Sequence, residues 1–140
     1  EGPERINLEK VASELGMGDR VQFLGQKSHR QVRSLLKQAA AFVLNSIYEG
    51  LPHVVIEAMS CQVPVIATNI KGTNEVITDG LTGLLVSPGN TGELKDSIAK
   101  LIRDDDLRNR LVANALGLVK QKFTWQENLF TLERELEALI

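Results

Sequence analysis

The sequence predicts an α/β protein built on a parallel β-sheet with helices on both faces. Short apolar segments rich in strand-forming residues alternate with longer segments whose apolar residues recur at helical spacing. This alternation is typical of parallel sheets, because each helix carries the chain back to the edge where the next strand begins. At 140 residues the chain is expected to form one domain with a core of its own.

The first third of the sequence is expected to supply two helices and two strands. A helix over residues 8–15 ends at Gly16, since glycine is common just past a helix C-terminus. Residues 21–25 predict a short strand, and residues 41–44 predict a second one made of four apolar residues. The apolar face of the intervening helix consists of Val32, Leu35, Leu36, Ala39 and Ala40.

The remaining elements follow the same alternation. Residues 63–68 and 84–86 predict buried strands, with a short turn of helix or strand at residues 75–77 between them. Acidic residues 104–106 are expected to cap the start of a helix, where negative charge is favourable. One helix before this cap presents Leu94, Ile98, Leu101 and Ile102 on one face, and a last helix after Phe123 presents Leu129, Leu132, Leu136 and Leu139.

Function is expected to depend on the segment that follows the strand at residues 41–44. Gly50 and Pro52 break this strand, and proline suits the first turn of a helix, where a missing N–H costs nothing. Residues 53–61 then predict a mostly apolar helix. Glu49 therefore lies in a loop at the carboxyl end of a strand, where parallel α/β sheets bind ligands, and Glu57 lies about one turn into the helix.

This arrangement favours an anion beside two carboxylates. Residues 50–54 would present backbone N–H groups at a helix N-terminus, which favours an anion such as a diphosphate. A carboxylate pointing at that diphosphate would repel it, so Glu49 is expected to face a neutral, hydroxyl-rich group beside the anion. Carboxylates accept hydrogen bonds from hydroxyls strongly. The pair therefore indicates a ligand with the order sugar, diphosphate, ribose.

Glu49 and Glu57 also carry a family resemblance. With seven residues between them, they resemble the E-x7-E signature of retaining glycosyltransferases with the GT-B fold, specifically glycosyltransferase family 4 (group 1). The surrounding Glu-Gly-Leu-Pro and Glu-Ala-Met-Ser, with Pro-Val-Ile-Ala-Thr at residues 64–68, strengthen the resemblance. It covers nearly the whole chain. It implies that residues 1–140 are the Rossmann-like, C-terminal half of a two-domain enzyme, lacking its first strand and the N-terminal acceptor domain.

The resemblance also implies roles for individual residues. Glu49 resembles the first glutamate, which contacts hydroxyls of the donor sugar and is the candidate catalytic residue. Glu57 resembles the second, which holds the ribose hydroxyls. The family's segment that lies against the base of the nucleotide corresponds here to Leu24, Gly25 and Gln26. The backbone that would cradle the sugar and diphosphate is that of Gly50, Leu51, Pro52, His53 and Val54, although Pro52 has no N–H.

Two departures from the family pattern stand out. The family usually has glycine where Gln62 stands, so the helix is expected to end differently here. The usual Gly-Gly-x-Pro-Glu appears as Lys-Gly-Thr-Asn-Glu at residues 71–75.

The reaction that the resemblance implies is sugar transfer from a UDP- or GDP-type donor to an acceptor hydroxyl, with retention at the anomeric carbon. The acceptor would be a sugar, a lipid-linked sugar or a polysaccharide, bound through the N-terminal domain. Catalysis would rest on positioning and on electrostatic stabilisation of the leaving diphosphate. No metal is expected to take part, because Cys61 is alone and the two histidines lie far apart. The chain without its other half is expected to be inactive.

Composition excludes several other classes. A hydrophobic content of 43% and a net charge of −2 describe an ordinary soluble globular protein, without the basic excess that nucleic-acid binding requires. No apolar run approaches the roughly 18 residues of a membrane span. The single cysteine fits a reducing, cytoplasmic setting. Peripheral association with the cytoplasmic membrane face remains open for the full enzyme.

Two alternatives to a glycosyltransferase donor domain stay open at this point. The chain could be a non-catalytic nucleotide-binding or assembly subunit that keeps the fold beside a catalytic partner. A nucleotide-sugar epimerase of the same fold is less favoured, because the surroundings of the two glutamates resemble those of transferases.

Overall fold

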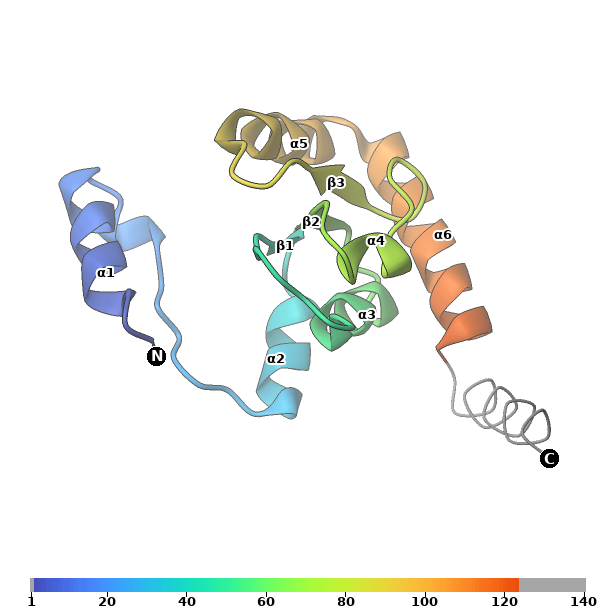
Figure 1. Cartoon of the computed structure of the whole chain (residues 1–140), viewed down its shortest axis with the longest axis horizontal. Coiled ribbons are helices and arrows are strands. Elements are labelled where there is room, and N and C mark those ends of the chain that lie inside the picture. The colour runs from blue at the N-terminus through green and yellow to red at the C-terminus, as the bar shows by residue number, and fades with distance from the viewer. Residues whose placement is uncertain (1, 124–140) are drawn as a thin grey trace. The chain divides into compact units, whose positions relative to one another are not determined.

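The chain divides into two compact units, Glu1–Val32 and Arg33–Ile140. The structure is a computed structural model that describes residues 2–123 (Figure 1). The helix predicted after Phe123 lies outside the described residues. Each unit is described by itself.

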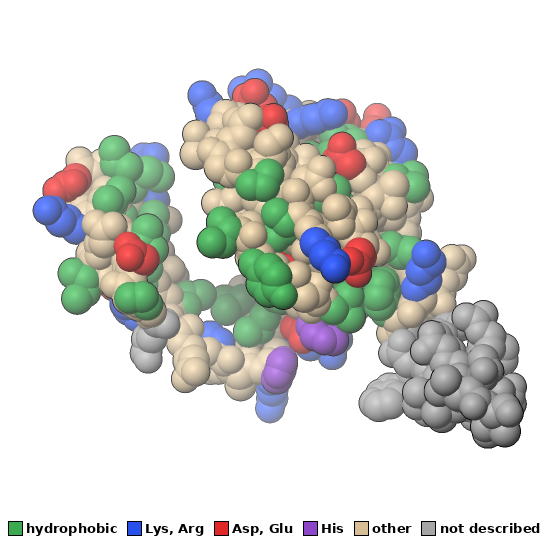
Figure 2. Space-filling view, in the orientation of Figure 1, with side chains coloured by type: hydrophobic (Ala, Val, Ile, Leu, Met, Phe, Trp, Pro, Cys, Tyr) green, Lys and Arg blue, Asp and Glu red, His purple; other side chains and the backbone are tan. Residues whose placement is uncertain are grey.

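The first unit is formed mainly by helix α1 (Arg5–Glu14) and the short 3-10 helix η1 (Gly18–Arg20). The predicted first helix is confirmed, and Gly16 follows it with a φ of 66°, the left-handed conformation expected past a helix end. No residue of α1 or η1 is buried, and hydrophobic side chains reach the surface of α1 (Figure 2).

The strand predicted at residues 21–25 does not form. Val21 has extended backbone angles, but the segment pairs with no other strand of the described residues. Gly25 has a φ of 64°, which lies outside the β region. A strand needs a hydrogen-bonded neighbour as well as a suitable composition. Residues 21–25 therefore run as an extended but unpaired segment.

The second unit is built on the predicted parallel sheet. Its strands are β1 (Phe42–Leu44), β2 (Val65–Thr68) and β3 (Leu84–Val86), in the order β1-β2-β3. Leu44 lies opposite Ala67, and Thr68 lies opposite Val86. The three strands point the same way, so the loops that follow β1 and β2 leave the same edge of the sheet.

Helices cover both faces of this sheet. Helix α3 (His53–Ser60) and the short α4 (Thr73–Val76) lie on one side of the strands, and α5 (Thr91–Arg103) lies on the other (Figure 1). Helix α6 (Asp105–Lys122) packs against both α3 and α5. Helix α2 (His29–Leu36), which runs from the first unit into the second, stops before Ala39 and Ala40 and buries Leu36 alone. The predicted fold class is confirmed.

The core of the second unit is apolar and well enclosed. Val55, Ala58 and Met59 bury the inner face of α3. On the other side of the sheet, the cluster beneath α5 and α6 consists of Ile66, Leu84, Val86, Leu101, Leu107 and Leu111. Ile102 was predicted on this buried face of α5 but is 66% exposed. The prediction is wrong because Ile102 follows the buried Leu101 directly, and a helix turns 100° per residue.

The ends of the helices show which local predictions hold. The Asp104 carboxylate accepts a hydrogen bond of 2.8 Å from the Leu107 N–H, so the predicted cap of α6 is confirmed.

The end of α3 differs from the prediction, because Gln62 has a φ of 61°. Helix α3 therefore ends in the left-handed conformation that glycine would adopt, and the expectation of a different ending is wrong. The Val63 N–H donates to the Ala58 carbonyl across this turn at 3.0 Å.

Candidate functional site

Two loops meet at the carboxyl edge of the sheet in the second unit. The loop of residues 45–52 joins β1 to α3 and carries Glu49, whereas the loop of residues 69–72 joins β2 to α4. Gly72 marks where the two loops touch. A Cβ atom at Gly72 would lie 2.1 Å from the Gly50 carbonyl oxygen and 2.7 Å from that of Glu49. Only glycine allows this approach, and its φ of 93° also requires glycine.

The Glu49 carboxylate is held by a neighbour in its own loop. The Ser46 hydroxyl donates a hydrogen bond of 2.7 Å to Glu49 Oε1, and the Glu49 side chain is half-buried. Thr68, at the end of β2, donates to the Ser46 carbonyl at 2.5 Å. Thr68 is only 1% exposed. The loop that carries Glu49 is therefore tied to the adjacent strand through hydrogen bonds.

Helix α3 begins beside Glu49. Pro52 is the N-cap residue, and its lack of an N–H costs nothing at that position. The His53 N–H donates to the Leu51 carbonyl at 2.9 Å. Among the described residues, the N–H groups of Gly50, Leu51 and Val54 donate to no backbone carbonyl. These three of the four N–H groups in residues 50–54 are available to an anion at the helix N-terminus.

Glu57 lies on the same helix, about one turn after its start. Its side chain is half-buried on α3, although its near neighbours Val55, Ala58 and Met59 are fully buried. A carboxylate at the rim of an apolar helix face can accept hydrogen bonds from a ligand without full loss of hydration. Glu49 and Glu57 thus lie on one continuous segment that starts at the carboxyl edge of the sheet.

The candidate base-binding residues belong to the first unit. Leu24 and Gly25 line a cavity of about 390 Å³, and Gln26 follows directly in the chain. The other residues that line the cavity are Gly2, Pro3, Glu4, Arg5, Leu8, Gln22 and Phe23. A cavity of this volume is within the range that binds small ligands.

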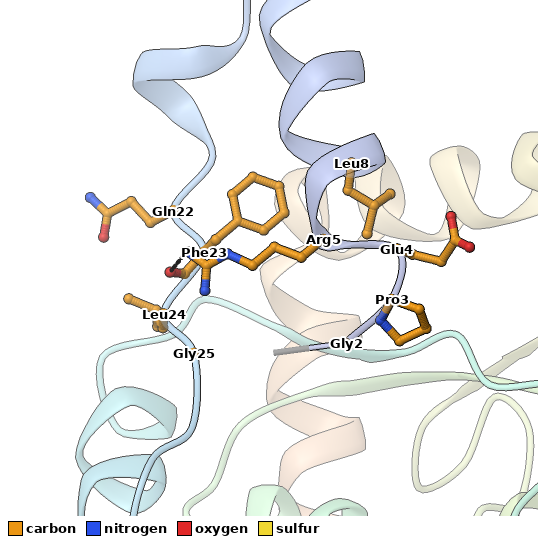
Figure 3. Close-up of a pocket in the computed structure, with 9 residues that line it drawn as sticks. All are labelled: Gly2, Pro3, Glu4, Arg5, Leu8, Gln22, Phe23, Leu24 and Gly25. Atoms are coloured by element: carbon orange, nitrogen blue, oxygen red, sulfur yellow. Dashed lines mark hydrogen bonds between the residues drawn. The ribbon is translucent and has the colours of Figure 1, made fainter.

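Arg5 connects α1 to the wall formed by residues 22–25. Figure 3 shows its side chain reaching from the start of α1 to the Phe23 backbone. The guanidinium donates to the Phe23 carbonyl at 3.5 Å and lies 6.0 Å from the centre of the Phe23 ring. Its Nε also donates to the Glu9 carboxylate at 2.7 Å. Arg5 therefore holds the extended segment against α1 in place of strand pairing.

Within residues 2–123, no three His, Cys, Asp or Glu side chains are grouped so as to hold a metal ion. None of the helices in that part of the chain is both long and apolar enough to cross a lipid bilayer.

Comparison with known proteins decides the family. Residues 1–117 match the family described as glycosyl transferases group 1. The chain belongs to this family. It is also 37% identical over 124 residues to the alpha-D-kanosaminyltransferase of Streptomyces kanamyceticus, covering 89% of this chain and 32% of that protein. The chain thus spans about a third of the length of the curated relatives it matches.

Solved structures confirm the fold of this group 1 chain. Sucrose-phosphate synthase from Thermosynechococcus elongatus has a TM-score of 0.86 at 33% identity, over 99% of this chain and 36% of that one. The Anabaena protein HepE, solved in complex with UDP-glucose, has a TM-score of 0.87 at 27% identity, over 95% and 36% of the two chains. The fold is the Rossmann-like fold of GT-B glycosyltransferases, and the chain corresponds to the C-terminal domain of such an enzyme.

Three residues of the site were not anticipated from the sequence. Ser46, Thr68 and Gly72 together fix the loop of Glu49. Ser46 stands three residues before Glu49, a spacing at which a hydroxyl can reach a carboxylate across a tight loop, so a signal was present. Thr68 ends an otherwise apolar strand, and Gly72 is a single glycine in a polar loop. Neither pattern alone indicates a partner in another loop.

Proposed function

We propose that this chain is the donor-binding half of a retaining glycosyltransferase, which transfers a sugar from a nucleotide diphosphate to an acceptor hydroxyl. The observation that carries the proposal is the meeting of Glu49 with the N-terminus of α3 at the carboxyl edge of the sheet. Membership of the group 1 glycosyltransferases supports it. The binding of UDP-glucose by the similar HepE supports a UDP-sugar as the first donor to test.

Each part of the donor has a proposed place. The N–H groups of Gly50, Leu51 and Val54 meet the diphosphate, whose negative charge the helix N-terminus favours. Glu49 accepts hydrogen bonds from hydroxyls of the donor sugar, and Glu57 accepts them from the ribose. The base lies against Leu24, Gly25 and Gln26.

The chemistry that these groups supply is electrostatic. The helix N-terminus stabilises the negative charge that grows on the leaving diphosphate, and the two carboxylates hold the sugar and ribose in position. We propose that the reaction needs no metal ion. Glu49 and Glu57 do not act as the acid and nucleophile of a hydrolase, because the proposed diphosphate lies between them. The acceptor, whether a sugar, a lipid-linked sugar or a polysaccharide, binds through another domain of the enzyme.

Titration with nucleotides tests the proposal. UDP, GDP and ADP and their glucose or mannose conjugates are added to the isotope-labelled chain, and backbone amide shifts are followed. One diphosphate is expected to shift the amides of residues 50, 51 and 54. Glu57→Gln is expected to weaken that binding by roughly 1–3 kcal/mol, because a charge-assisted hydrogen bond to the ribose is lost.

A matched control separates the role of Glu57 from the loss of one negative charge. Asp96→Asn changes an exposed carboxylate on α5 and is expected to leave the affinity unchanged. The same shifts in a longer protein that includes the other domain would support the donor site. Absence of any shift at residues 50–54 in both proteins would overturn the donor site and favour a non-catalytic assembly subunit.

A further inference from the structure

Hydrogen bonds, and not apolar packing, fix the loop that carries Glu49. Ile47 and Tyr48, the two large side chains directly before Glu49, are 92% and 81% exposed. They contribute little buried area that would hold the loop in one conformation. A flexible glutamate in such a loop would lose considerable conformational entropy on ordering, so some other contact must hold it.

That contact is a chain of two hydroxyl groups starting in the core. Thr68, almost fully buried at the end of β2, donates to the Ser46 carbonyl at 2.5 Å. The Ser46 hydroxyl then donates to Glu49 Oε1 at 2.7 Å, a usual distance for a hydroxyl bonded to a carboxylate. The backbone of Glu49 is held as well, because Gly72 of the neighbouring loop lies directly against its carbonyl.

The loop of Gly72 is itself anchored in the core. Thr73 is completely buried, and its hydroxyl lies within hydrogen-bonding distance of the Thr68 and Ile70 carbonyls. The Ile70 N–H donates back to the same hydroxyl at 3.2 Å. Both walls that confine Glu49 are therefore fixed by buried threonines, one at the end of β2 and one at the start of α4. This rigidity is what a preorganised binding group requires.

We propose that Ser46 is a positioning residue for Glu49, and that Thr68 positions Ser46 in turn. The Ser46 hydroxyl donates to Oε1 of Glu49, whereas Oε2 accepts no hydrogen bond from the described residues. One oxygen is thus committed to the loop and the other is presented to a hydroxyl of the donor sugar. The inference rests on the proposed function, and it assigns Ser46 to recognition of the sugar and not of the nucleotide.

The test compares a nucleotide with its sugar conjugate on wild type and Ser46→Ala. Calorimetry gives the affinity for UDP and UDP-glucose, and for GDP and GDP-mannose, on the longest protein that contains this chain. Ser46→Ala is expected to weaken binding of the sugar nucleotide about 3- to 10-fold, the effect of one hydrogen bond. Affinity for the free nucleotide is expected to stay unchanged. A general loss of structure would lower both affinities together.

Two further variants identify the route of the effect. Ser60→Ala removes another serine hydroxyl, bonded to the Ile56 carbonyl at 2.7 Å on α3, and is expected to leave both affinities unchanged. In the Glu49→Gln background, Ser46→Ala is expected to weaken binding of the sugar nucleotide much less than it does in the wild type, because the two residues act as one unit. Thr68→Val is expected to reproduce the loss that Ser46→Ala causes, and Thr68→Ser to restore the affinity.

The outcomes distinguish this inference from the proposed function. If neither nucleotide nor sugar nucleotide binds the wild type, the proposed function fails and the inference fails with it. If the wild type binds both ligands but Ser46→Ala leaves the ratio of their affinities unchanged, the donor site stands and the role of Ser46 is overturned. The role of Ser46 would also be overturned if Ser46→Ala weakened binding of the sugar nucleotide equally in the wild type and in Glu49→Gln.

Discussion

Leucines of the first unit and of the second unit meet opposite surroundings. Leu15, just after α1, is 68% exposed, whereas Leu111 of α6 is completely buried beneath the sheet. Leu15 directly follows α1, whereas Leu111 lies within α6. A leucine on or beside a helix is therefore buried only where other elements pack against that helix.

The same contrast separates the loop of Glu49 in the second unit from the segment of residues 22–25 in the first unit. In the second unit, Glu49 is confined by buried groups, namely Thr68 and the backbone around Gly72. In the first unit, the candidate base segment is held by one side chain, Arg5, through its contacts with Phe23. We therefore expect the loop of Glu49 to be rigid and residues 22–25 to be displaced more easily. Variants that compare matched positions in the two units test this expectation.

The largest effect is expected at Gly72. A Cβ there would overlap the Gly50 and Glu49 carbonyl oxygens, and the φ of 93° disfavours any other residue. Because one loop must move, Gly72→Ala is expected to lower the free energy of unfolding by about 4 kcal/mol, combining backbone strain with overpacking. Urea denaturation of the purified chain measures it.

Gly16 is the matched glycine of the first unit. It has a similar φ of 66°, but a Cβ there would meet nothing within 4 Å. Gly16→Ala is expected to cost only about 1–2 kcal/mol, from the left-handed backbone alone. Equal costs at Gly16 and Gly72 would show that the contact between the two loops does not constrain the second unit.

The next largest loss of stability is expected from truncating leucines to alanine. Leu111→Ala leaves a cavity against Ile66 and Leu101, so it should lower the free energy of unfolding by about 3 kcal/mol. Leu15→Ala changes the same side chain at an exposed position and should stay within about 0.5 kcal/mol. Chemical denaturation of both variants gives the comparison. A similar loss from Leu15→Ala would mean that the first unit has a hidden apolar partner in solution.

Most of the second unit could be predicted from the sequence because its signals are local. The strands at residues 42–44, 65–68 and 84–86 are short apolar runs, and each is followed by turn residues. The predicted strand at residues 21–25 also contains strand-forming residues but finds no partner strand among the described residues. Its failure reflects a requirement of pairing, which no single segment reveals.

The candidate site shows the same division. Glu49, Pro52 and Glu57 could be placed on a loop and a helix from residue types alone, and their proposed roles remain predictions. The contact of Gly72 with the loop of Glu49 could not, since it joins residues 22 and 23 positions apart through the order of the strands. Gln62 shows a further limit. Its left-handed backbone was not predicted because glutamine carries no preference for that conformation.

The smallest effect is expected at Glu93, an exposed residue of the otherwise well-packed second unit. Its carboxylate accepts hydrogen bonds from the Ser87 N–H at 2.6 Å, the Ser87 hydroxyl at 3.2 Å and the Asn90 amide at 2.7 Å. The bond from the Ser87 backbone, followed by that from its hydroxyl, lowers the pKa of Glu93 below its ordinary value. The charged form of Glu93 is therefore the one that stabilises the cap of α5.

The sign of the pH dependence follows from the lowered pKa. A carboxylate whose pKa is lower in the folded state contributes its full stability above the unfolded value of about 4.3, and loses it as pH falls through the folded value. The melting temperature of Glu93→Gln should therefore lie below that of the wild type at pH 7, and the gap should narrow below about pH 4. Ser87→Ala keeps the shorter bond from the Ser87 backbone, so the gap between its melting temperature and that of the wild type should narrow less as the pH falls. A gap that stays constant from pH 7 to about pH 3 would contradict this. A gap as large as that of Leu111→Ala would mean that exposed polar contacts hold the second unit as firmly as its core.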